Sequence, residues 1–270
     1  MITAIPIHGL CNRMLLVDSA LALGRLLGRE VHLTWRLAPD LNCRLERLFE
    51  PVPGIARVRT LPALKGLDRV LLRVAWRWAG WRGADLWRHR DLRPLAADPA
   101  ALVERARRAP HVVVRGDLRF FQHGPLMRGW RLVPALAARV EAVAPRLATA
   151  VGVHVRRTDH VRAIARSPLA AFERAMDAAR AAEPGCPFFV ASDDPQVLAH
   201  LAQRYGPALF HHPPGSFDRS QPQAIEAAAV DLFSLARCRR VIGTHSSTFS
   251  RVAAQLGTLP LELATGPAPA

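Results

Sequence analysis

Residues 149–159 read Thr-Ala-Val-Gly-Val-His-Val-Arg-Arg-Thr-Asp, an apolar run that ends in two arginines and a carboxylate. Near-continuous apolar runs of this length are typical of strands buried on both faces of a parallel sheet. Side chains alternate along a strand, so Arg157 is expected on one face and His154 with Arg156 on the other. Because α/β proteins bind ligands at the carboxyl ends of their strands, both arginines are candidate binding residues. The alternative is a structural strand end, where Asp159 pairs with one of the arginines.

Similar short apolar runs alternate with helical patterns along nearly the whole chain, which predicts βαβ units and an α/β fold. Besides residues 149–155, strands are expected at residues 2–7, 30–35, 55–61, 111–115, 187–191, 208–210 and 240–243. Helices are expected at residues 14–27, 67–79, 99–109, 169–182, 195–205, 223–236 and 249–256.

The domain boundary is expected where an Ala-rich helix begins at Pro134 and stops near Pro145, just before the next strand. This predicts an N-terminal Rossmann-like domain at 1–133, a connecting helix and linker at 134–148, and a C-terminal domain at 149–270. Two such domains facing one another would hold ligands at the carboxyl ends of both sheets.

The composition is that of a globular chain, because 50% of the 270 residues are hydrophobic and 22% are charged. This excludes a disordered chain, a collagen and a disulfide scaffold. The net charge of +15 (37 basic minus 22 acidic residues) suggests a polyanionic partner such as a phosphate. Lys65 is the only lysine, so part of the arginine excess can reflect base composition of the genome.

The four cysteines lie far apart with no C-x-x-C pair, which argues against a zinc site and a disulfide framework. The first residues form a strand-like run and not a secretion signal, and no apolar stretch approaches the length of a membrane span. We therefore expect a cytoplasmic protein.

Three further segments follow predicted strands and are candidate phosphate-binding sites. The first is the turn of residues 8–13, where Gly9, Asn12 and Arg13 precede a helix, although any α/β protein needs such a turn. The second is a pair of acids, Asp193 and Asp194, one of which is expected to cap the following helix. The other acid could hold ribose hydroxyls or order a neighbouring arginine.

The third segment is a run of hydroxyl side chains, Ser246, Ser247 and Thr248, at the start of a helix. Its hydroxyls and helix N–H groups could donate to a phosphate, and the alternative is a serine-rich helix cap. No D-x-D sequence, the spacing that presents a metal to a nucleotide sugar, occurs in the chain.

At these segments the sequence resembles the GDP-fucose-dependent fucosyltransferase superfamily, closest to the branch of α1,6-fucosyltransferases and bacterial nodulation fucosyltransferases. Residues 152–159 match its H-x-R-R-x-D block, residues 191–195 its strand ending in two acids, and residues 231–252 its segment ending in Ser-Ser-x-x-x-Arg-Val. The turn at Gly9 fits the diphosphate loop loosely. The resemblance covers mainly residues 149–256, whereas residues 36–130 match nothing.

The resemblance implies a GT-B-like fold of two facing Rossmann-like domains and an inverting, metal-independent transfer of fucose from GDP-fucose, with no cofactor. The acceptor would be a glycan or a lipid-linked hydroxyl, on the N-terminal side. Arg156 and Arg157 would face the diphosphate, with help from Ser247 and the Gly9 turn. His154 and Asp231 would lie on the guanine side.

One departure from the family concerns the catalytic base. The family block continues with a Lys and then a Glu important for acceptor activation, and here those positions are His160 and Ile164. Asp159 and His160 are the candidate substitutes, because a histidine beside a carboxylate can accept a proton. Otherwise the base lies on the N-terminal domain or on the acceptor itself.

Three other functions compete with this interpretation. The missing Glu would suit a non-catalytic relative that binds a GDP-sugar, and the donor could be a different GDP-sugar. A nucleic-acid-binding protein is disfavoured, because the arginine pair ends a buried-type strand and is not spread along a groove.

Residues 65–93 hold four of the six tryptophans and eight basic residues. Arg69, Arg73 and Arg77 would form one stripe of an amphipathic helix. The segment is interpreted either as an ordinary core helix with a solvated arginine face, or as a peripheral contact with the anionic inner membrane face.

Overall fold

The computed structural model describes residues 1–62, 83–158, 161–213 and 215–266. The chain divides into two compact units: Met1–Val133 with Arg219–Ile225, and Pro134–Asp218 with Glu226–Ala270. The expected boundaries differ from these in two places. The helical segment after Pro134 belongs to the second unit, as α5 (Pro134–Glu141) and α6 (Ala144–Leu147). Residues 219–225 return to the first unit because Asn42 donates hydrogen bonds to the carbonyls of Arg219 and Ser220.

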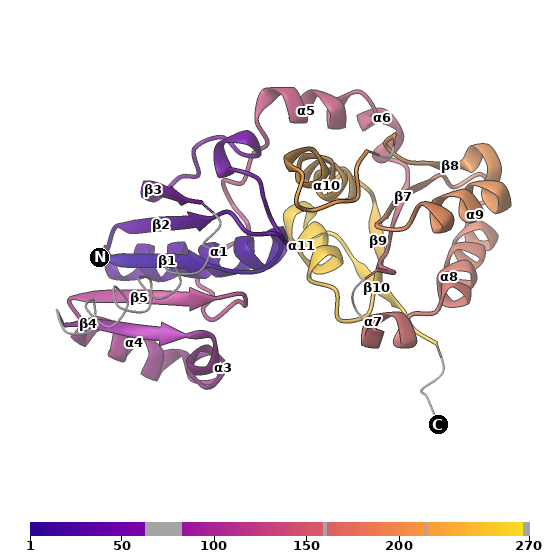
Figure 1. Cartoon of the computed structure of the whole chain (residues 1–270). Coiled ribbons are helices and arrows are strands. Elements are labelled where there is room, and N and C mark those ends of the chain that lie inside the picture. The colour runs from indigo at the N-terminus through magenta and orange to yellow at the C-terminus, as the bar shows by residue number, and fades with distance from the viewer. Residues whose placement is uncertain (63–82, 159–160, 214, 267–270) are drawn as a thin grey trace. The chain divides into compact units, whose positions relative to one another are not determined.

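The first unit is built on a five-stranded sheet of order β3-β2-β1-β5-β4, and every pairing is parallel (Figure 1). Its strands are β1 (Ile2–Pro6), β2 (Val31–Arg36), β3 (Ile55–Leu61), β4 (Ala84–Arg88) and β5 (His111–Gly116). Its helices are α1 (Leu10–Leu27), α3 (His89–Ala97) and α4 (Pro99–Arg108), with a 3-10 turn at Leu45–Arg47. Helix α1 packs along β1, the central strand.

The second unit has a five-stranded parallel sheet of order β10-β9-β6-β7-β8. Its strands are β6 (Val151–Val155), β7 (Phe188–Ser192), β8 (Leu209–Phe210), β9 (Arg240–Thr244) and β10 (Leu261–Ala264). Its further helices are α7 (Val161–Arg166), α8 (Leu169–Ala182), α9 (Pro195–Tyr205), α10 (Pro222–Leu235) from Glu226 on, and α11 (Thr248–Gly257), with a 3-10 turn at Gly206–Ala208. Two parallel sheets with intervening helices confirm the predicted α/β class.

Five elements differ clearly from the predicted pattern. Strand β4, helix α3, helix α7 and strand β10 were not expected, and α1 begins four residues earlier than predicted. Strands β4 and β10 lie at sheet edges, where side chains face solvent and the apolar signal is weak. Helix α1 starts early because Gly9 is its N-cap, so the helix follows β1 almost directly.

The proposed membrane segment is only partly within the described residues. The predicted helix with Arg69, Arg73 and Arg77 lies outside them. Trp87 is described, and it is fully buried on β4, where its Nε1 donates to Asp85 and its ring packs edge-on against another aromatic ring. Trp87 therefore belongs to the core of the first unit and not to a membrane interface. Among the helices that the structure describes, none is long and apolar enough to cross a bilayer.

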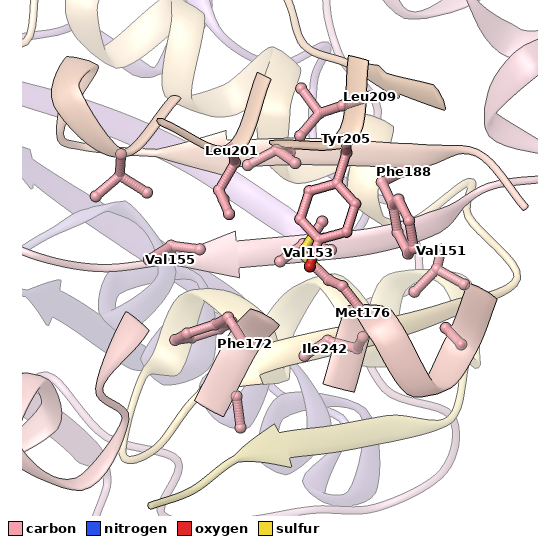
Figure 2. Packing of buried hydrophobic residues seen from close by; sticks show 14 of the residues in the cluster. Val151, Val153, Val155, Phe172, Met176, Phe188, Leu201, Tyr205, Leu209 and Ile242 are labelled. Carbon is pink, nitrogen blue, oxygen red and sulfur yellow. The ribbon is translucent and has the colours of Figure 1, made fainter. Parts of the chain in front are cut away.

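The core of the second unit lies against β6. Val151, Val153 and Val155 point to one face of the sheet, and Figure 2 shows them between side chains of α8 and of α9, including Phe172 and Tyr205. All three valines are buried, and this face is apolar because alternate residues of β6 are valine. His154 lies on the opposite face of the strand, so its side chain is not part of this apolar cluster.

Phe172 provides a test of this core. Its ring on α8 is fully buried, so Phe172→Ala should lower the free energy of unfolding by about 3–5 kcal/mol through lost burial and a residual cavity. Urea unfolding followed by circular dichroism measures the loss. Val161→Ala is the control, because Val161 is 81% exposed and its truncation should change stability by less than about 0.5 kcal/mol. Equal effects for the two variants would contradict the packing described.

Candidate functional site

The carboxyl end of β6 is fixed from one side by a threonine of β9. The Thr244 hydroxyl is fully buried, donates to the His154 carbonyl at 2.9 Å and accepts from the Arg156 N–H at 3.0 Å. Both bonds act on the backbone of the strand that carries the arginines. Thr244 therefore sets where Arg156 leaves the sheet.

The same strand end is fixed from the other side by Asp193, which directly follows β7. Its carboxylate accepts from the Arg157 N–H at 2.7 Å and from the Thr158 hydroxyl at 2.7 Å. The neighbouring Asp194 is the N-cap of α9 and accepts from the Gln196 N–H at 2.8 Å. The two acids thus have the two roles weighed for them: Asp194 is the cap, and Asp193 orders the arginine turn.

Arg157 lies on the α8 face of the sheet, as the alternation of side chains predicts. Its Nη1 donates to the Ser167 carbonyl at 2.8 Å, and its guanidinium lies 5.7 Å from the centre of the Phe172 ring. Burial lowers the pKa of Arg157, and its Nη2 is buried with no hydrogen-bond partner among the described residues. A buried donor of this kind is costly to leave unpaired, so it suits a ligand oxygen.

His154 lies on the opposite face and is buried. Its Nδ1 lies 2.8 Å from the Ser250 hydroxyl, and its ring stacks on Phe249 with the centres 4.6 Å apart. Burial lowers the pKa of His154 to about 4, and the positive charge of Arg156 acts in the same direction. The imidazole is therefore neutral at pH 7.

The hydroxyl-rich turn after β9 completes this edge of the second sheet. Ser247 is the N-cap of α11 and accepts from the Phe249 N–H, while Thr248 is the first residue of the helix. Ser246 has a φ of 59°, in the left-handed region, and its hydroxyl contacts His245. Strands β7, β6 and β9 are neighbours, so this turn, the arginines and Asp193 lie along one sheet edge.

Asp231 lies on α10, the helix that covers the His154 face of β6. The contact is close, because a Cβ at Gly152 would lie 2.9 Å from Leu235 of this helix. Burial raises the pKa of the Asp231 carboxyl to about 7, and Arg139 acts in the opposite direction. The carboxyl can therefore gain or lose a proton near neutrality.

In the first unit, the predicted loop residues lie on a helix instead. Gly9 is the N-cap of α1, and Asn12 and Arg13 belong to its first turns. Arg13 is 1% exposed and donates to the carbonyls of His8 and Arg36, and burial lowers its pKa to about 10. The structure thus gives Arg13 a structural role that the sequence did not predict. A Cβ at Gly9 would meet nothing within 4 Å, so the space beside this helix end is open.

Asp159 and His160 lie outside the described residues, and Ile164 lies on α7. In the part of the chain that the structure describes, no group of three or more His, Cys, Asp or Glu side chains is arranged to hold a metal ion.

Sequence reasoning missed three hydroxyl residues that support the site: Thr244, Ser167 and Ser250. Ser167 accepts from the His245 N–H at 2.9 Å through its hydroxyl and from Arg157 through its carbonyl. A buried serine within a segment of no clear periodicity gives no signal of this role. Ser250 could have been suspected, because Gly243 leaves room for it: a Cβ there would lie 2.4 Å from the Ser250 Cβ.

The low pKa of His154 predicts a pH dependence of stability. In the unfolded chain His154 binds a proton near pH 6.5, and in the folded chain only near pH 4. The contribution of the neutral ring to the free energy of unfolding is therefore complete above pH 6.5 and falls as the pH drops towards 4. Between pH 7.5 and 5.0, the wild type should lose about 2 kcal/mol more than His154→Gln, which cannot titrate. Urea unfolding at both pH values measures this difference, and equal losses would show that His154 is not buried as a neutral ring.

Comparison with known proteins gives matches at the level of structure. No protein-family model and no curated protein sequence matches the chain. A structure of NodZ alpha-1,6-fucosyltransferase soaked with GDP-fucose matches with a TM-score of 0.64 and 21% identity, over 94% of this chain and 92% of that one.

Two other fucosyltransferases match at lower identity. A structure of an Arabidopsis thaliana FUT1 mutant in complex with GDP matches with a TM-score of 0.62 and 14% identity, over 97% of this chain and 70% of that one. POFUT1 in complex with GDP has a TM-score of 0.52 and 14% identity, over 97% of both chains. The chain therefore has the fold of these fucosyltransferase structures.

Proposed function

We propose that this chain is an inverting, metal-independent glycosyltransferase that moves fucose from GDP-fucose to a hydroxyl of a glycan or glycolipid. The observation that carries the proposal is the turn after β6, where Asp193 and Thr244 position Arg156 and Arg157 at the sheet edge. The N-terminus of α11 lies at the same edge. The fold shared with fucosyltransferase structures supports the proposal.

The chemistry of this edge suits a diphosphate. Guanidinium groups donate paired hydrogen bonds to phosphate oxygens, and the first N–H groups of a helix add partial positive charge. As the sugar leaves, negative charge grows on the diphosphate, and fixed arginines stabilise it where other enzymes use a cation. Arg156 is assigned the main part of this role, with Arg157, Ser246, Ser247 and Thr248 as further donors.

The guanine base is assigned to the other face of the sheet, to His154 and Asp231. A carboxylate can accept hydrogen bonds from two N–H groups of guanine at once, and adenine has no matching pair of donors. Neutral His154 adds no charge near the base. The protonated Asp231 would have to lose its proton on binding.

A second candidate is a non-catalytic GDP-sugar-binding protein, because Ile164 stands where the family carries a Glu. A donor carrying another sugar is equally compatible with a site argued from the diphosphate and the base. Turnover of GDP-fucose and of other GDP-sugars distinguishes these options.

The first test is nucleotide binding. Calorimetry in EDTA should detect GDP binding, and Arg156→Ala should weaken it at least tenfold, because it removes a charged donor to phosphate worth about 1.5–3 kcal/mol. Arg174→Ala is the matched control, since Arg174 is an exposed arginine on α8.

Three outcomes would contradict the proposed GDP site: no binding at millimolar GDP, binding only with a divalent ion, or equal binding of AMP. Urea unfolding of the Arg156 variant guards against a structural cause. A stability loss as large as the loss in affinity would mean that Arg156 only supports the strand end.

The second test concerns Asp231. If GDP binds only the carboxylate form, a pKa near 7 makes the affinity for GDP rise roughly tenfold between pH 6 and pH 8. Asp231→Asn should bind GDP more weakly and lose this rise. Loss of the rise in this variant would show that it comes from Asp231 and not from titration of the phosphate. A variant that keeps the full pH dependence would remove Asp231 from the guanine site.

A further inference from the structure

Most of the positive charge of the chain lies in the first unit. That unit holds 24 basic and 11 acidic residues, a net charge of +13, whereas the second unit holds 13 basic and 11 acidic residues, a net charge of +2. The proposed GDP site belongs to the second unit, so the nucleotide does not account for this excess. A separate anionic ligand bound to the first unit would account for it.

Two arginines of the first unit leave neighbouring strands side by side. Strands β4 and β5 are parallel neighbours (Figure 1), and Arg88 at the end of β4 pairs in register with Arg115 of β5. The next residue, Gly116, faces α1 and α3, since a Cβ there would lie 3.3 Å from Leu16 and 2.4 Å from Leu92. Because side chains alternate, both arginines lie on the other face of the sheet, at its carboxyl edge. This edge is where α/β proteins bind ligands.

The charge of Arg115 is not neutralised within the described residues. Its side chain is half-buried, its Nε is buried with no hydrogen-bond partner, and no acidic side chain pairs with it or with Arg88. Burial lowers the pKa of Arg115, and the positive charge of Arg88 acts in the same direction. Asp117 lies two residues further on, but its carboxylate lies against the rings of His8 and His89. A buried donor without a partner is costly, so Arg115 suits a ligand oxygen.

Arg29 of the same unit shows the bonds of a structural arginine. It is also half-buried, and its guanidinium donates to the carbonyls of Ala106, Arg107 and Ala109 at 2.8, 3.1 and 2.7 Å. These bonds hold the C-terminal end of α4. Arg115 has no bonds of this kind among the described residues, so the fold of the unit does not explain why it is half-buried.

We infer that Arg115 and Arg88 bind a carboxylate or phosphate group of a saccharide, so that the acceptor of the transferase is an acidic glycan; this inference rests on the proposed function. A guanidinium donates paired hydrogen bonds to two oxygens of such a group, and guanidinium groups on adjacent strands can hold one group together. The exposed rings of His8 and His89, at the same sheet edge, can bond to sugar hydroxyls.

A discrete anionic group fits these arginines better than an anionic membrane surface does. Lipid headgroups in a bilayer reach exposed side chains, whereas Arg115 is half-buried and its Nε is covered. The carboxylate of one sugar residue, or one phosphate, is small enough to approach such a side chain.

The experiment measures binding of D-glucuronate and D-glucose 6-phosphate to the full chain by ligand-observed NMR. Methyl glucoside is the neutral sugar, and inorganic phosphate is the anion without a sugar. The wild type should bind at least one acidic sugar at least tenfold more tightly than either of these. The two acidic sugars distinguish a carboxylate site from a phosphate site. Arg115→Gln should weaken the binding at least tenfold and leave the affinity for GDP, measured by calorimetry, unchanged.

Urea unfolding gives a readout that separates a binding arginine from a structural one. Arg115→Gln removes a half-buried charge without a partner, so the urea midpoint should be unchanged or higher. Arg29→Gln is the matched control, because it removes the same charge from the same unit but also the bonds to three carbonyls. It should lower the urea midpoint and leave the binding of the acidic sugar unchanged.

The outcomes separate the two proposals. If the wild type does not bind GDP, the proposed function fails, and binding of an acidic sugar would then show a saccharide site without fucose transfer. If the wild type binds GDP but no acidic sugar more tightly than methyl glucoside, or if Arg115→Gln binds the acidic sugars like the wild type, the inference is overturned while the GDP site stands.

Two further results would also overturn the inference. Inorganic phosphate that binds as tightly as the acidic sugars would show an anion site that does not recognise a saccharide. Binding to phosphatidylglycerol vesicles that is lost in Arg115→Gln, with no binding of the acidic sugars, would assign the arginines to a membrane surface instead.

Discussion

The turn that carries the two arginines depends on the carboxylate of Asp193. Without this acceptor, the part-buried Arg157 N–H would lack a partner beside a buried strand end, at a cost of about 1–3 kcal/mol. The carboxylate is in reach because Val155 pairs with Ser192, so β6 and β7 end together. The register between β6 and β7 therefore also determines where the two arginines lie.

The bonds that fix this turn act on backbone and neutral groups. Asp193 accepts from the backbone of Arg157, and the Arg157 guanidinium donates to the uncharged carbonyl of Ser167. Thr244 likewise acts through a neutral hydroxyl. The backbone that carries the two arginines is thus held in place by bonds that do not involve the Arg156 guanidinium.

Much of the second unit could be predicted from the sequence, because buried parallel strands and amphipathic helices leave strong local patterns. Helices α8 and α9 match their predicted ranges, and so does β3 in the first unit. Edge strands such as β10 leave a weaker pattern, since half of their side chains face water. The cap role of Asp194 was predictable from the proline that follows it.

The remaining parts of the site depend on contacts between distant residues, which no local pattern reveals. Ser167 reaches His245 across 78 positions of the chain, and Arg13 is buried because the carbonyls of His8 and Arg36 need a donor. An arginine beside a glycine turn resembles a phosphate ligand in sequence, although here its donors are used within the fold.

The charge of the arginine turn limits which other chemistry the same sheet edge can support. Positive charge stabilises a leaving diphosphate but weakens a nearby base, because it disfavours the protonated imidazole. His154 illustrates the effect: burial lowers its pKa to about 4, Arg156 contributes, and the ring cannot serve as a base at neutral pH. The positive charge that suits a diphosphate therefore makes the arginine turn a poor place for a general base.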